Sequence, residues 1–202
     1  MANIITLTGA SRCGKSFIRN LFLEAKNEVF NPILFIKETT RPARANDDDV
    51  IHRDRISEKC DFVYEQYGVR YGFSFDELYD HLQKGESPIV VVNDIRAVED
   101  LRVAVGEQVV SLFIYRQPPK LQDFIDEELK RLKDKNNESD REKAIKAAHV
   151  RMEKAVAIHR IYIENIYLFD NVILNITNEV EKTRQQVLHI VEKMTKSIEG
   201  LK

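Results

Sequence analysis

Residues 3–16 read Asn-Ile-Ile-Thr-Leu-Thr-Gly-Ala-Ser-Arg-Cys-Gly-Lys-Ser, and this stretch decides the fold. A short apolar run around Ile5 predicts a strand, and an amphipathic pattern that begins at Lys15 predicts a helix. Between them lies Gly-x-x-x-x-Gly-Lys-Ser, the complete P-loop pattern in the strand-then-helix context that it requires. Backbone N–H groups in such a turn, together with the helix N-terminus, bind phosphate oxygens without any side chain in the way. The stretch therefore predicts a nucleotide-phosphate site.

The side chains of this loop predict how a nucleotide is held. Lys15 is expected to reach the β- and γ-phosphates, and the Ser16 hydroxyl is expected to hold Mg²⁺. Cys13 is expected to be a small filler inside the loop. The residues expected to contact ATP are Gly9, Ala10, Ser11, Arg12, Cys13, Gly14, Lys15, Ser16 and Phe17.

The composition suits a single α/β domain with small inserted segments. The chain has 202 residues, of which 43% are hydrophobic and 32% charged, and that length can bury a core. A net charge of -2 argues against a broad nucleic-acid surface, and no apolar run is long enough for a membrane helix. The two cysteines, Cys13 and Cys60, suggest no disulfide framework, so we expect a cytoplasmic protein.

Apolar runs alternate with amphipathic segments along most of the chain. This alternation predicts a parallel α/β sheet with right-handed crossovers. Further strands are expected over residues 32–37, 62–67, 70–72, 88–93, 109–115 and 171–175. Helices are expected over residues 17–25, 75–85, 98–105, 121–132, 144–169 and 178–197. The polar stretch Lys133–Arg141 is expected to form a loop or a mobile lid.

Charged side chains gather after two of the predicted strands. The stretch Glu38-Thr-Thr-Arg-Pro-Ala-Arg44 carries two arginines, whose guanidinium forks match a phosphate or carboxylate, although solvated loop arginines are the alternative. The aspartates at 47–49 are interpreted as a solvated turn. Asp94 follows the strand at 88–93, so it either faces a ligand at the sheet edge or caps the next helix.

Three segments together resemble the guanylate kinase family. They are the P-loop, the stretch Thr39-Thr-Arg-Pro-Ala-Arg44, and Tyr71-Gly72, in the family's order and rough spacing over nearly the whole chain. The resemblance implies a parallel-sheet P-loop kinase core with a small acceptor flap and a helical lid. The implied single domain has its core at 1–36, 88–132 and 144–202, its flap at about 37–87 and its lid at about 133–143.

The resemblance also implies an activity and a set of site residues. The implied reaction transfers the γ-phosphoryl group of ATP, with Mg²⁺, to a nucleoside monophosphate, with GMP or dGMP first. The partner is a small-molecule phosphate acceptor, with no nucleic acid or membrane, and the chain is a monomer or homodimer. Arg131 and Arg151 are implied to be catalytic, and Asn175 to lie near the adenine ring. The implied acceptor-binding residues are Lys37, Arg41, Arg44, Arg53, Tyr71 and Asp94.

Departures from the family pattern keep other functions open. Phe62 stands where the family carries a guanine-reading Glu, and Glu65 can replace it only if the loop is shortened. Lys37 stands where a Ser is usual. The segment from Asn93 to Arg96 resembles the ribose 1,5-bisphosphate phosphokinase branch, so a sugar-phosphate kinase is the second reading. A non-catalytic guanylate-kinase-like interaction module is the third, and the intact P-loop argues against it.

Overall fold

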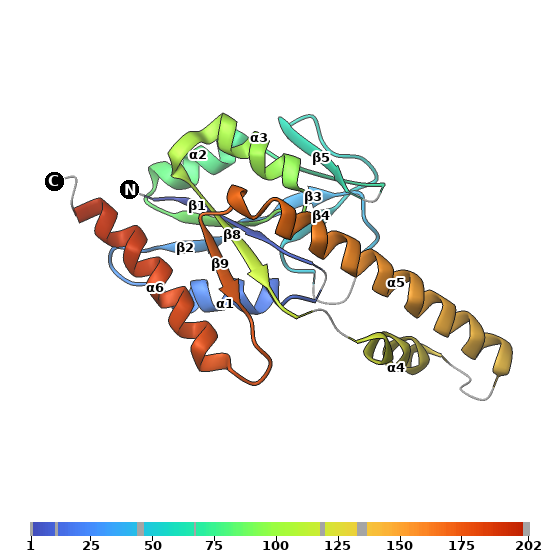
Figure 1. Cartoon of the computed structure of the whole chain (residues 1–202). Helices are drawn as coiled ribbons and strands as arrows, with labels where there is room; N and C mark the ends of the chain where they lie inside the picture. Colours follow the sequence, from blue (N-terminus) through green and yellow to red (C-terminus); the bar gives the residue numbers. More distant parts are fainter. Residues whose placement is uncertain are drawn as a thin grey trace.

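The computed structural model describes residues 2–10, 12–43, 47–66, 68–117, 120–132 and 137–199 (Figure 1). Its centre is a five-stranded parallel sheet with the strand order β2-β7-β1-β8-β9. The strands are β1 (Ile4–Thr8), β2 (Pro32–Leu34), β7 (Ser87–Val91), β8 (Val109–Tyr115) and β9 (Asn171–Leu174). All five residues of β1 are buried, as expected for a middle strand that is covered on both faces. The predicted P-loop therefore leaves the sheet at its centre.

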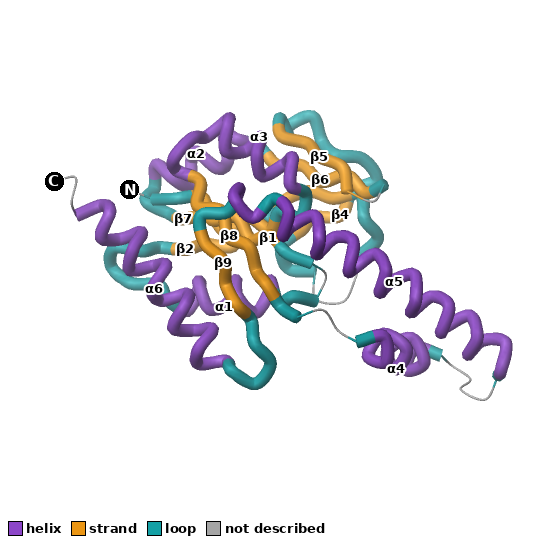
Figure 2. The backbone as a smooth tube through the Cα atoms, in the orientation of Figure 1, coloured by secondary structure: helices purple, strands orange, loops and turns teal. Residues whose placement is uncertain are grey.

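Helices cover both faces of this sheet (Figure 2). On one face lie α1 (Lys15–Glu24) and α6 (Val180–Glu199), which pack with the sheet around Phe22, Leu112 and Ile190. On the other face lie α2 (Phe75–Gln83) and α3 (Ile95–Val105), which pack with the sheet around Leu78, Val98 and Phe113. The two hydrophobic clusters form the layers expected of a parallel α/β fold.

A second, four-stranded mixed sheet has the order β4-β3-β6-β5. It consists of β3 (Lys37–Thr39), β4 (Val50–His52), β5 (Phe62–Gln66) and β6 (Val69–Phe73). The two strands predicted around Gly68 are present as the β5–β6 pair, and Gly68 has a φ of 73°. The sheet lies at the side of the core and within the segment expected to form the flap (Figure 1).

The apolar run predicted as one strand over residues 32–37 is divided between the two sheets. It pairs with β7 only up to Leu34, and Lys37 then begins β3 of the second sheet. Phe35 lies between them and is 3% exposed. Its ring packs edge-to-face with the ring of Phe73 in β6, with the ring centres 5.8 Å apart. The run stays apolar because Phe35 is buried where the chain passes from one sheet to the other.

The helices α4 (Leu121–Arg131) and α5 (Glu138–Glu164) pack against each other and extend away from the core (Figure 1). The predicted loop at 133–141 is wrong from residue 138 onward, because α5 already begins at Glu138. Asn137 caps this start by accepting a hydrogen bond from the Asp140 N–H at 3.3 Å. The short helices η1 (Gly106–Gln108) and η2 (Ile166–Leu168) complete the fold. Among the residues that the structure describes, none of the helices combines the length and the hydrophobicity that a membrane span requires.

Candidate active site

The turn between β1 and α1 has the geometry of a phosphate cradle. Gly14 takes a φ of 96°, which favours glycine, and it immediately precedes the first residue of α1. A Cβ on Gly14 would lie 2.1 Å from Asn175 Nδ2, and one on Gly9 would lie 2.7 Å from the backbone oxygen of Ile114. Both positions therefore require glycine for close packing as well as for a turn. The first residues of α1, Lys15 and Ser16, line a cavity.

Lys15 and Ser16 both line this cavity. The Lys15 ammonium group donates hydrogen bonds to the backbone oxygens of Gly9 and Ala10, both at 2.9 Å. The Ser16 side chain is exposed at the first turn of α1. A lysine held inside the loop by carbonyl groups is placed to exchange these partners for phosphate oxygens, which carry more negative charge.

Two side chains from other strand ends hold the back of the loop. Asn175 follows β9 and donates from Nδ2 to the Cys13 backbone oxygen at 2.7 Å. Arg116 follows β8 and donates to the Arg12 backbone oxygen at 3.3 Å. Arg12 has a φ of 69°, so these contacts hold a residue in a left-handed conformation. Cys13 is 3% exposed and belongs to the hydrophobic core, as expected of a small filler.

The cavity beside the loop, which we call the phosphate chamber, has a volume of about 330 Å³. Four cationic side chains line it, from the loop, from α1 and from the second sheet, and one carboxylate joins them. These five residues are Arg12, Lys15, Lys37, Arg41 and Asp49. A space of this size with an excess of positive charge is suited to phosphate groups.

Lys37 begins β3 and is 4% exposed, which is unusual for a lysine. Its ammonium group donates to the Val91 backbone oxygen, lies 4.0 Å from Asp49 Oδ2, and stands 5.5 Å from the centre of the Tyr71 ring. Burial is the largest cause that lowers the pKa of Lys37 from 10.5 to about 8; the Asp49 charge opposes this shift, and the Lys15 and Arg41 charges contribute to it. An anion in the chamber would stabilise its charged form.

Arg41 lies just after β3 with one end of its guanidinium group paired. Its Nη2 donates to Asp47 Oδ1 at 2.7 Å. Its Nη1 is buried, and no described residue accepts a hydrogen bond from it. A buried guanidinium N–H group without an acceptor lowers the stability of the fold. A phosphate oxygen bound in the chamber would accept its hydrogen bond. Tyr71, whose ring stacks on Tyr64 at 5.3 Å, lines the same chamber.

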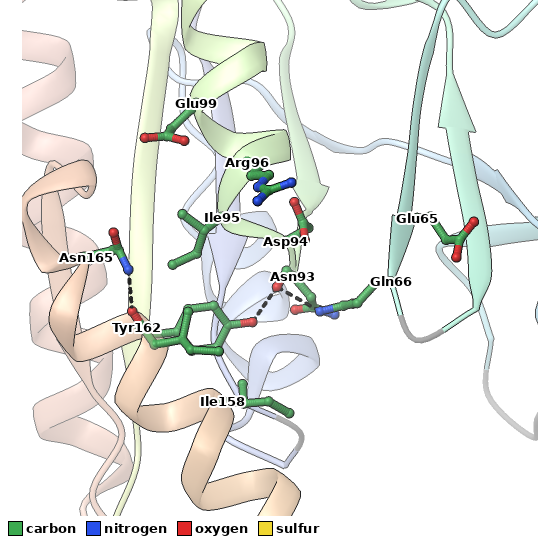
Figure 3. A pocket seen from close by; sticks show the side chains of 11 residues that line it. Glu65, Gln66, Asn93, Asp94, Ile95, Arg96, Glu99, Ile158, Tyr162 and Asn165 are labelled. Atoms are coloured by element: carbon green, nitrogen blue, oxygen red, sulfur yellow. Dashed lines mark hydrogen bonds between the residues drawn. The ribbon is translucent and has the colours of Figure 1, made fainter.

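A second cavity, which we call the distal chamber, has a volume of about 510 Å³ and is drawn in Figure 3. Gln66, Asn93, Ile158 and Tyr162 line both chambers, so the two spaces are adjacent. The Tyr162 hydroxyl and the Gln66 amide, the latter at 2.8 Å, both donate to the Asn93 backbone oxygen (Figure 3). The charged residues of the distal chamber are Glu65, Asp94, Arg96 and Glu99.

Asp94 caps helix α3 and also lines a cavity at the sheet edge, which are the two alternatives that its place in the sequence left open. Its side chain accepts a hydrogen bond from the Ala97 N–H at 2.9 Å and so caps α3. It also lines the distal chamber, next to Arg96 (Figure 3). Capping uses one carboxylate oxygen, and the second oxygen remains able to accept a hydrogen bond from a ligand.

Other predicted site residues lie outside these chambers. Arg53 is half exposed and pairs with Glu38 Oε1 at 3.2 Å. Phe17 packs against the hydrophobic core. Arg151 of α5 pairs with Glu128 and, at 3.6 Å, with Glu127 of α4. Arg131 ends α4 without a described side chain, and Ser11 and Arg44 lie outside the described residues.

Three residues that the sequence analysis did not select as site residues join the two chambers. They are Gln66 of β5, Asn93 just after β7, and Tyr162 of α5. The hydrogen bonds to Asn93 join residues 27 positions apart for Gln66 and 69 positions apart for Tyr162. Periodicity places Tyr162 among buried helix residues, and nothing local connects it to Asn93. Only the tertiary fold brings these groups together.

No family model matches the chain. The guanylate kinase of Syntrophus aciditrophicus (strain SB) is 29% identical over 209 residues, covering 98% of this chain and 92% of that protein. The crystal structure of guanylate kinase from Anaplasma phagocytophilum shares the fold with a TM-score of 0.62 at 20% identity, covering 96% of this chain and 86% of that one. The chain is therefore similar over nearly its full length to a guanylate kinase, and it shares the guanylate kinase fold.

Proposed function

We propose that the chain transfers the γ-phosphoryl group of ATP to the phosphate of a nucleoside monophosphate, with GMP or dGMP as the acceptor. The observation that carries this proposal is the opposite charge of the two adjoining chambers. The phosphate chamber holds four cationic side chains and one carboxylate, whereas the distal chamber holds three carboxylates and one arginine. GMP has the same polarity, with a phosphate dianion at one end and the neighbouring N–H donors of guanine at the other.

The charge of the distal chamber favours guanine among such acceptors. Guanine presents two neighbouring donors, N1–H and N2–H, which a carboxylate can accept together. Asp94 lines the chamber beside Arg96, whereas the Glu65 side chain on β5 points away from Gln66 and Asp94 (Figure 3). Phe62 cannot take this part, because its ring is 8% exposed and stacks on Phe73 at 4.7 Å. The Asp94 carboxylate is therefore proposed to read the base.

The proposed mechanism depends on positioning and charge neutralisation, since phosphoryl transfer needs little covalent help from a protein. Lys15 and the loop N–H groups hold the donor phosphates, while Lys37, Arg41 and Tyr71 hold the acceptor phosphate. Ser16 fits the magnesium ion that the family implies, because its exposed hydroxyl offers a hard oxygen ligand next to the phosphates. When bound, this ion neutralises phosphate charge.

We propose the same division into core, flap and lid that is expected from the sequence, with the lid at about 133–143. Arg131 and Arg151 are proposed to neutralise the transferring phosphoryl group. Arg151 is now held by Glu128 and Glu127. It would exchange these carboxylates for phosphate oxygens when both substrates are bound.

A panel assay tests the proposal. The protein is mixed with Mg-ATP and, separately, with GMP, dGMP, AMP, UMP and ribose 1,5-bisphosphate, and ADP release is followed. Turnover with GMP or dGMP above all others is expected. Turnover with ribose bisphosphate alone would exclude the nucleotide kinase, and folded protein that turns over none of them would favour an interaction module.

The second candidate is a sugar-phosphate kinase like the ribose 1,5-bisphosphate phosphokinase branch, and Arg96 is the observation that favours it. Arg96 lines the distal chamber, and it makes no ion pair with any residue that the structure describes. It is a candidate contact for a second acceptor phosphate. Three carboxylates around it oppose a dianion in that place, so this candidate stands second.

Asp94→Asn is expected to separate the two positions of Asp94. Asparagine caps a helix about as well as aspartate, so the free energy of unfolding should change by less than about 0.5 kcal/mol. The loss of charge in the distal chamber should raise the KM for GMP about tenfold, because a charge-assisted hydrogen bond becomes a neutral one. Urea unfolding and steady-state kinetics measure both quantities. An unchanged KM would leave Asp94 as a cap alone.

A further inference from the structure

The three aspartates at 47–49, predicted as a solvated turn, are only partly solvated, because Asp48 is 54% exposed whereas Asp47 and Asp49 are 14% and 23% exposed. Each carboxylate faces a cationic side chain, from α1 or from the segment that contains β3. Asp47 pairs with Arg41 at 2.7 Å, Asp48 with Arg19 at 2.6 Å, and Asp49 lies 4.0 Å from the Lys37 ammonium group. Two of these cations line the phosphate chamber, and the third, Arg19, belongs to α1. The triplet therefore connects the flap to the helix that carries the P-loop residues Lys15 and Ser16.

The Arg19–Asp48 pair has the geometry of a strong contact. Arg19 Nη1 donates to Asp48 Oδ1 at 2.7 Å, and Nη2 donates to Oδ2 at 2.6 Å, so the pair is bidentate. The Asn20 side chain accepts from Nε at 3.2 Å and also from Nη2 at 3.1 Å. Arg19 is only 5% exposed, and a charge so deeply buried needs a partner. These hydrogen bonds hold the pKa of Asp48 below its ordinary value.

The location of this pair links the donor side of the site to the acceptor side. Arg19 is three residues after Ser16, so both side chains lie on the same side of α1. Asp48 stands between the partners of Arg41 and Lys37. A shift of Asp48 would therefore move the carboxylates that hold both acceptor cations. Backbone bonds from Lys37 N–H to the Asp49 oxygen at 3.3 Å and from Arg53 N–H to the Thr39 oxygen at 2.9 Å pass such a shift on to β3.

We propose that Arg19 and Asp48 are a positioning pair that holds the flap against α1 and thereby sets Lys37 and Arg41 at their working distance from the P-loop. The inference rests on the proposed function only in the tests that measure the KM for GMP. Neither residue lines either chamber, so neither touches an acceptor bound there. The pair acts through Lys37 and Arg41.

The main test compares Asp48→Asn with a control variant that breaks a different ion pair of α1. The Asp48 side chain is 54% exposed, so this variant is expected to fold. The control is Arg184→Met, which removes the Arg184–Glu24 pair at 2.7 Å, a bond from α1 to α6 on the side away from the flap. Asp48→Asn should raise the KM for GMP about tenfold while the KM for ATP stays within about twofold, because only the acceptor cations shift. The control should leave both unchanged.

A purely stabilising pair would lower the free energy of unfolding without this split between the two KM values. Arg19→Met and the double variant Arg19→Met/Asp48→Asn complete a cycle. If the two residues act as one unit, the double variant should raise the KM for GMP no further than the larger single change. Multiplying effects in the double variant, or equal changes in both KM values, would overturn the proposal.

Hydrogen exchange keeps the inference testable when no acceptor is turned over. In the free protein, Asp48→Asn should speed amide exchange in residues 37–40 and 50–53 about tenfold, whereas Arg184→Met should not. Unchanged exchange together with an unchanged KM would overturn the positioning pair. Faster exchange in a protein without kinase activity would refute the proposed function and leave the positioning pair standing.

Discussion

Lys15→Ala is expected to reduce kcat with ATP and GMP by at least about a hundredfold while the chain stays folded. The Lys15 ammonium group is the cation nearest to the loop carbonyls, 2.9 Å from both Gly9 and Ala10 oxygens. In the proposed mechanism it moves from these oxygens to the γ-phosphate and neutralises the charge that develops there. Alanine cannot supply that charge, so the loss should appear in kcat as well as in the KM for ATP.

Two controls separate the loss of the Lys15 charge from a general loss of charge and from unfolding. Lys84→Ala removes an exposed lysine at the end of α2 and should leave kinetics unchanged. Circular dichroism and urea unfolding of Lys15→Ala should match the parent protein within about 1 kcal/mol, because its two hydrogen bonds are partly exposed. Full activity in a folded Lys15→Ala variant would refute the donor-site assignment.

The parts of the fold that could be predicted from the sequence are those set by local patterns. The P-loop needs only a strand, a glycine turn and a helix start, which are consecutive in the chain, and all three occur where expected. The strand Val109–Tyr115 has the predicted bounds, because a strand buried on both faces reads as one apolar run. The division of residues 32–37 between two sheets was missed, since burial of Phe35 keeps the run apolar across the break.

Helix α5 shows why periodicity alone was insufficient. Val150 continues the apolar spacing of the helix predicted over residues 144–169, yet it is 43% exposed. Most of α5 extends beyond the sheet (Figure 1), and only its C-terminal part brings Tyr162, 2% exposed, against the core. An amphipathic pattern predicts burial only when another element covers the apolar side.

The site could be predicted in part for the same reason. Charge and spacing pointed to Lys15 and Arg41, and the resemblance added Lys37 and Tyr71, all of which line the phosphate chamber. The partners of these groups could not be predicted, because ion pairs such as Arg19–Asp48 join residues 29 positions apart. A run of three aspartates is typical of a solvated turn, and only the fold brings three cations next to these carboxylates.

Lys37→Met is expected to have opposite effects on stability and on acceptor affinity. The folded pKa of Lys37, about 8, lies below its ordinary value of 10.5. Between these pH values the folded chain therefore binds fewer protons than the unfolded chain, and stability rises with pH. The destabilising effect of the buried charge is complete below pH 8 and disappears toward pH 10.5. A shift of this size corresponds to roughly 3 kcal/mol.

Methionine removes this buried charge but also leaves the Val91 oxygen and Asp49 without their lysine partner. We therefore expect the variant to be about 1–2 kcal/mol more stable at pH 7, with the difference shrinking as the pH approaches 10. Urea unfolding at both pH values measures it. Lys84→Met, on an exposed site, should show no such pH-dependent difference. A variant less stable than its parent at pH 7 would contradict this account of Lys37.

The same substitution should raise the KM for GMP at least tenfold at pH 7, because a desolvated cation–phosphate contact is lost, as in buried charge pairs generally. In the parent protein the KM for GMP should rise as the pH passes above about 8, where Lys37 loses its proton. Lys37→Met should lack this rise, since it has no proton to lose. A rise that persists in Lys37→Met would assign the titration to another group. A more stable variant with weaker acceptor binding would mean that Lys37 is kept charged and buried for binding, at a cost in stability.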